Sequence, residues 1–167
     1  MNNIETLVLN REMALTAALT GVALVAPLAH SQLVTGTLVN AALFSAVMLV
    51  GFRAAATVAV IPSLIALAVG TLPMVMAPML AFIMASNIVL AGVFSLARKA
   101  GYWTSAIIAS LAKCGLLVIS ANIVLATLTH GKMTVALASM MGWPQLITAV
   151  LGATLAFALF ERKSLSK

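Results

Sequence analysis

Long apolar runs interrupted by single charges are the feature that most constrains this chain. Of its 167 residues, 63% are hydrophobic and 7% are charged, whereas an ordinary soluble domain is about half apolar and about a quarter charged. Nine Lys and Arg with three acidic residues are too few to cover a surface that faces water. The pattern therefore predicts a protein embedded in a lipid bilayer.

Cutting the sequence at its charges, prolines and polar clusters gives six apolar segments. A helix needs about 20 apolar residues to cross the hydrocarbon layer. We therefore expect an all-α integral membrane protein, a single domain over residues 1–167, with six transmembrane helices at about 12–29, 37–52, 54–72, 78–97, 104–129 and 144–160. Pro62 is expected to kink the third helix, and Pro78 to begin the fourth. The apolar segment 133–141 is too short to cross, so we expect a surface or re-entrant piece there.

Positive charges fall mainly on one side of this layout. If the N-terminus is inside, one charge, Lys132, lies outside, and the inner side carries Arg11, Arg53, Arg98, Lys99, Arg162, Lys163 and Lys167. Because Lys and Arg accumulate in cytoplasmic loops, this asymmetry predicts that the N-terminus and the C-terminus are both cytoplasmic. The cations are scattered singly and form no basic face, so we expect no nucleic acid partner.

Several kinds of chemistry are disfavoured by what the sequence lacks. The acidic residues are Glu5, Glu12 and Glu161, all near the termini, and there is no Asp. An interior without carboxylates argues against acid/base hydrolysis and carboxylate metal sites. The sequence also contains no glycine-rich phosphate loop, no metal-spaced His and Cys set and no nucleophile elbow. We therefore expect neither an enzyme nor a bound metal or cofactor.

Polar side chains inside the apolar segments are the main candidates for function, because each is costly in hydrocarbon unless it meets a helix, a cavity or a ligand. Four stand out: Asn40, Asn87, Lys113 and Asn122. The alternative for each Asn is a hydrogen bond between helices, and Lys113 could instead extend toward the inner membrane surface. Lys113 and Asn122 are nine residues apart, which places them on opposite faces of one helix.

The last segment begins with a distinctive polar and aromatic group, Gly142-Trp143-Pro144-Gln145. Trp143 could stack on a flat heterocycle, while Gln145 could both donate and accept hydrogen bonds. Residues Gln145, Thr148, Gly152 and Ala156 share one helix face, as in a helix that lines an outward-facing pocket. A membrane-interface position is the alternative for Trp143. The predicted substrate-binding residues are Asn40, Asn87, Lys113, Asn122, Trp143 and Gln145.

The first segment has Ala14 and Ala18 four residues apart, which lets another helix pack closely. Six spans in a chain of this size, with that strip, resemble the substrate-binding S components of energy-coupling factor (ECF) transporters. The stretches 36–41, 77–87 and 142–149 also look like parts of short bacterial S components. The resemblance therefore extends over nearly the whole chain and implies an S-component-like bundle.

The resemblance implies a multi-pass protein of the bacterial plasma membrane that captures a vitamin or related heterocyclic micronutrient outside. The loop from His30 to Gly36 would cover the pocket. Ala14 and Ala18 would dock the protein on a transmembrane T component that works with two cytoplasmic ATPases. A neutral or weakly anionic heterocycle is favoured, because no acid inside the membrane would pair with a cation; vitamin B6-like compounds, pyrimidine vitamin precursors and pantothenate are candidates. A stand-alone secondary transporter and a structural subunit of a larger membrane complex remain alternatives.

Overall fold

The computed structural model describes residues 3–70, 74–127 and 140–161. In these ranges the chain is helical and contains no strand. Its α-helices are α1 (Asn3–Val25), α2 (Gln32–Leu49), α3 (Phe52–Ala68), α4 (Leu80–Ala97), α5 (Tyr102–Thr127) and α7 (Trp143–Ala156). Short 3-10 turns cover Ala26–Ala29, Met74–Met79 and Arg98–Ala100, and a π-helical turn covers Phe157–Glu161.

Five helical stretches among the described residues are long and apolar enough to cross a membrane. They cover most or all of α1, α2, α4, α5 and α7, and they indicate a multi-pass membrane protein. Helix α3 contributes a shorter apolar stretch, Phe52–Ile65. The third predicted span was expected to continue to residue 72, but α3 ends at Ala68 and Gly70 follows with a φ of 72°. A glycine in this left-handed conformation is a common helix terminator.

Other predicted boundaries differ from the observed ones at the helix starts. The first helix begins at Asn3 rather than near residue 12, and the second begins at Gln32 rather than near residue 37. Pro62 lies inside α3 as predicted, whereas Pro78 lies in a 3-10 turn that precedes α4. Most of segment 133–141 falls outside the described residues.

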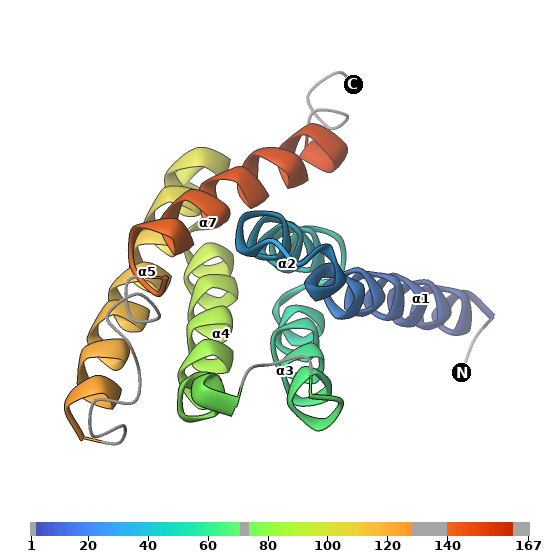
Figure 1. Cartoon of the computed structure of the whole chain (residues 1–167). Coiled ribbons are helices and arrows are strands. Elements are labelled where there is room, and N and C mark those ends of the chain that lie inside the picture. The colour runs from blue at the N-terminus through green and yellow to red at the C-terminus, as the bar shows by residue number, and fades with distance from the viewer. Residues whose placement is uncertain (1–2, 71–73, 128–139, 162–167) are drawn as a thin grey trace.

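The helices α3, α4 and α5 lie side by side, with α2 and α7 packed together across them (Figure 1). Helix α1 contacts α2 and α3 and projects from the other helices toward the N-terminus (Figure 1). An aromatic part of the core lies between α2, α4 and α5. The centroid of the Phe94 ring lies 4.7 Å from that of Phe44 and 5.4 Å from that of Tyr102, both edge to face. The Tyr102 hydroxyl donates a hydrogen bond of 2.6 Å to the Ala153 carbonyl, which joins α5 to α7.

Two glycines allow α2 and α7 to approach closely. A Cβ at Gly36 would lie 2.8 Å from the Thr148 side chain, and one at Gly152 would lie 2.6 Å from the Asn40 Cβ. Thr148, Gly152 and Ala156 are buried in this contact. The sequence suggested that their shared face lines a pocket, but it packs against α2 instead, because the glycines remove the side chains that would hold the helices apart. Of that face, Gln145 alone reaches the cavity described below.

Candidate binding site

A lysine and two asparagines from three different helices meet in the interior. Lys113 Nζ on α5 donates a hydrogen bond of 2.6 Å to Asn40 Oδ1 on α2 and another of 2.6 Å to Asn87 Oδ1 on α4. All three side chains are buried. The polar cluster, defined by these residues and Thr148, is therefore shared by the helices that form the centre of the fold.

Helix α7 completes the polar cluster through Thr148. Asn40 Nδ2 donates to Thr148 Oγ1 at 3.3 Å, and this hydroxyl donates to the Gln145 carbonyl at 3.0 Å. The amide of Asn40 thus has both its oxygen and its nitrogen bonded to other helices, and the amide oxygen of Asn87 is bonded to α5. Buried polar groups that bond to one another across helices favour one helix arrangement, so these hydrogen bonds hold the Lys113 ammonium in place.

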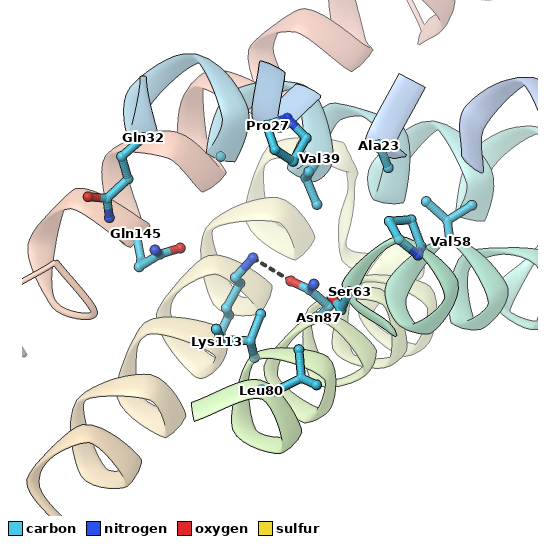
Figure 2. A pocket seen from close by; sticks show the side chains of 13 residues that line it. Ala23, Pro27, Gln32, Val39, Val58, Ser63, Leu80, Asn87, Lys113 and Gln145 are labelled. Atoms are coloured by element: carbon cyan, nitrogen blue, oxygen red, sulfur yellow. Dashed lines mark hydrogen bonds between the residues drawn. The ribbon is translucent and has the colours of Figure 1, made fainter. Parts of the chain in front are cut away.

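A cavity of about 180 Å³ lies beside the polar cluster and receives residues from α1 to α5 and from α7. Figure 2 shows Lys113 and Asn87 on one side of this cavity, with Gln145 facing Lys113 from α7. The other polar side chains in its lining are Gln32 and Ser63. Apolar walls come from Ala23, Pro27, Val39, Val58, Leu80 and Ile83. A mainly apolar hollow with a few converging polar groups is the usual form of a small-molecule site.

Two glutamines lie together at one edge of the cavity. Gln32 Nε2 donates to the Met140 carbonyl at 2.8 Å, and Gln145 Nε2 donates to the same carbonyl at 3.3 Å. Both side chains are half-buried and both line the cavity (Figure 2). The start of α2 is thereby tied to the segment that precedes α7, and the amides border the cavity together.

Four of the six predicted substrate-binding residues are brought together. Lys113, Asn87 and Gln145 line the cavity, and Asn40 lies behind Lys113 as its hydrogen-bond partner. Asn122 is placed elsewhere: it is exposed, and its Nδ2 donates to the Val118 carbonyl of its own helix at 2.8 Å. Its position opposite Lys113 on α5, which the residue spacing indicates, carries it away from the cavity.

Trp143 is also placed away from this cavity. Its side chain is 69% exposed and borders a separate hollow with Leu33 and Ile147 on the outside of the α2 and α7 contact. The structure therefore gives Trp143 no stacking position beside Lys113. An exposed indole on an apolar helix fits the membrane-interface alternative.

The segment expected to be a loop over the pocket is largely helical. After His30, which has a φ of 49°, α2 begins at Gln32 and includes Gly36. Gln32 and Gly36 still line the cavity, so this segment borders it as a helix start. Gln32 and Gly36 belong to the segment that was expected to cover the pocket, but neither they nor Ser63 were named as binding residues. No charge marks them, and their roles depend on which helices pair.

Ala14 and Ala18 lie on α1, are both exposed and do not line the cavity, although Ala23 near the end of the same helix does. Large apolar side chains on the same helix are exposed as well, among them Ile4, Leu7 and Met13. A strip of small residues on an exposed helix leaves room for another helix to approach.

Within residues 3–70, 74–127 and 140–161, no three His, Cys, Asp or Glu side chains lie close enough to hold a metal ion. No protein-family model, curated protein or solved structure matches the chain. The functional conclusion therefore rests on the chemistry of the site, because a fold alone does not determine function.

Proposed function

We propose that the chain is the substrate-binding S component of an ECF-type importer. It would capture a small vitamin or related heterocyclic micronutrient outside the cell and pass it inward after docking on a T component with two ATPases. The observation that carries this proposal is the cavity beside Lys113, which is lined from six helices and bordered by buried polar side chains. Polar groups held inside a membrane protein commonly mark a substrate pathway.

The position of the cavity along the chain supports an outward-facing site. Its lining comes from the end of α1 and the turn that follows it, from the N-terminal halves of α2, α4 and α7, and from the middle of α3, with Lys113 added from the middle of α5. The connections 26–31 and 69–79, which join α1 to α2 and α3 to α4, lie next to this lining in the chain. Arg53, Arg98 and Lys99 lie at the other connections, those from α2 to α3 and from α4 to α5. If the basic connections are cytoplasmic, the cavity lies in the outer half of the protein.

Both termini can lie in the cytoplasm only if the number of spans is even. The proposed layout therefore requires α3 to cross the membrane in addition to the five longer helical stretches. Its 17 residues correspond to about 25 Å of helix, which is at the lower limit for a span. Contacts between α3 and α1, α2 and α4 would support a short span inside the helical bundle. We propose six spans in a bacterial plasma membrane on this basis.

Ala14 and Ala18 are the proposed docking residues. Both are exposed, and the strip lies on the helix that projects from the others (Figure 1). A T-component helix could pack there without displacing any residue that lines the cavity. Ligand capture and docking would thus use different residues, with α1 contributing to both.

The test is vitamin transport in cells that produce the chain together with its proposed partners. Cells that express the chain with a T component and two ATPases should accumulate a vitamin, and cells that lack the ATPases should bind it without accumulation. Accumulation by the chain alone would contradict the proposal.

The buried lysine favours one second candidate, a secondary transporter that acts without ATPases. Ionisable residues inside membrane proteins often couple substrate movement to ions, and Lys113 is buried at a cavity. Purified chain in liposomes would then drive uptake when a proton or sodium gradient is imposed. The S-component proposal predicts no uptake under either gradient.

A further inference from the structure

The charge of Lys113 has only neutral partners in the polar cluster. Its ammonium contacts two amide oxygens, those of Asn40 and Asn87. The chain has no Asp, and its Glu residues at positions 5, 12 and 161 lie near the termini. Glu5 and Glu12 are on exposed turns of α1, away from the cavity. Amide dipoles solvate a buried ammonium but leave its unit charge unbalanced, so an anion beside it would be strongly stabilised.

The ammonium also has a donor to spare. A lysine ammonium carries three N–H groups, and two of them are directed to Asn40 and Asn87. Lys113 itself lines the cavity, and Figure 2 shows Nζ at its polar side with the Gln145 amide opposite. A ligand oxygen in the cavity can therefore complete the set of three hydrogen bonds.

The volume of the cavity limits the size of the ligand that supplies this oxygen. The cavity measures about 180 Å³, whereas an apolar protein cavity of about 150 Å³ holds one benzene molecule. One six-membered ring with a small substituent fits this space. The walls beside the polar groups are apolar, with Val39, Val58 and Ile83 among them, and such walls suit the faces of a ring.

We propose that the ligand of this cavity is a small monocarboxylate built on a single ring, with its carboxylate bound to Lys113 Nζ. This inference rests on the proposed function, because it names the substrate class of the same cavity. It narrows the expectation of a neutral or weakly anionic heterocycle to an acid. Asn40 and Asn87 position the ammonium, and Gln145 is placed to contact the ring or a ring nitrogen.

Nicotinate and nicotinamide provide a matched pair of probes, since they share one ring and nearly one size but differ in charge. Binding of each to the detergent-solubilised full chain would be measured by isothermal titration. We expect nicotinate to bind at least about tenfold more tightly than nicotinamide. In Lys113→Met the affinity for nicotinate should fall about hundredfold or more, because a buried charge pair loses one partner. The affinity for nicotinamide should change little.

Asn122→Leu is the control variant, because Asn122 is exposed and bonded to its own helix. Both affinities should remain as in the wild type. If Lys113→Met does not fold, the comparison of acid with amide in the wild-type protein decides the question alone. Equal binding of the two probes, or nicotinate binding that survives Lys113→Met, would overturn the proposal.

The outcomes also separate this inference from the proposed function. If nicotinate and nicotinamide both fail to bind while neutral pyridoxine binds, the proposal of a ring monocarboxylate as substrate is wrong and the S-component proposal stands. If the acid binds but uptake proceeds without ATPases, the substrate class stands and the S-component proposal is wrong. If no small molecule binds or copurifies, both proposals are wrong.

Discussion

Lys113 Nζ on α5 donates a 2.6 Å hydrogen bond to Asn87 Oδ1 on α4, although the two residues are 26 positions apart in the chain. The pair lies between the two helices that pack together most extensively. Asn87 is 3% exposed and Lys113 is 4% exposed, so both groups are shielded from the protein surface. This contact therefore links the packing of the fold to the polar side of the cavity.

Removing the Asn87 amide should destabilise the protein. We expect Asn87→Leu to lower the free energy of unfolding by about 1.5–3 kcal/mol, the range for hydrogen bonds to charged groups. Adding Lys113→Met to Asn87→Leu should recover part of this loss, because both polar partners are then replaced by apolar groups. Unfolding of the purified protein in detergent, followed by circular dichroism, would measure these changes.

Asn122→Leu is the matched control for Asn87→Leu, since it makes the same substitution at an exposed position on a neighbouring helix. We expect its unfolding free energy to stay within about 0.5 kcal/mol of the wild type. A loss at Asn122 as large as that at Asn87 would show that the polar cluster has no special role in stability.

The close contact of α2 and α7 gives a second prediction. Gly152→Ala would place a methyl group 2.8 Å from the Ala41 backbone nitrogen, so the helices must separate. We expect a loss of about 1–3 kcal/mol, as for other overpacked sites, with weaker binding of any ligand that depends on Asn40. Thermal unfolding and ligand titration would be measured on the same variant.

Gly115→Ala is the control for this experiment. Gly115 lies in α5, and a Cβ there would meet no atom within 4 Å. Alanine has the higher helix propensity by about 1 kcal/mol, so this variant should be as stable as the wild type or more stable. Similar losses in Gly152→Ala and Gly115→Ala would contradict a close helix contact at Gly152.

The topology can be tested with single cysteines in a Cys114→Ser background. We expect His30→Cys to react with a membrane-impermeant maleimide in intact cells. Arg53→Cys and Lys99→Cys should react only after the cells are permeabilised, because the proposed layout puts both connections in the cytoplasm. Labelling of Arg53→Cys and Lys99→Cys from opposite sides would remove the case for α3 as a span.

Docking on a T component should depend on the small residues of α1. We expect Ala14→Leu with Ala18→Leu to abolish copurification with the T component, because the larger side chains would block close helix packing. Ligand affinity should be unchanged, since neither alanine lines the cavity. Ala81→Leu, at another exposed alanine, is the control for added apolar bulk. Loss of assembly in the control as well would argue against a specific strip.

The positions of most helices could be predicted from the sequence, because apolar segments of about 20 residues have few alternatives in a bilayer. The end of α3 was harder to predict. The apolar run continues past Ala68, but Gly70 adopts a left-handed conformation that ends the helix. Composition gives the location of a span, whereas backbone conformation at one residue decides where it stops.

Part of the site could be predicted, because a polar side chain is costly in the hydrocarbon layer and is therefore a candidate for function. Asn40, Asn87 and Asn122 carry the same amide, and the sequence separates them only by placing Asn122 on the helix face opposite Lys113. The structure separates them, because Asn122 satisfies its amide on its own helix whereas Asn40 and Asn87 bond to Lys113. That difference depends on how helices distant in sequence pack, as does the close approach that Gly36 and Gly152 permit.

Mass spectrometry of small molecules that copurify with the protein tests the central claim most directly. Wild-type protein and Lys113→Met would be purified in parallel from cells grown in rich medium, and the extracted molecules compared. We predict that the wild type retains one small organic acid in a near-stoichiometric amount and that Lys113→Met retains little of it. Retention of the same molecule in equal amounts by both proteins, or of none by the wild type, would contradict a ligand site at Lys113.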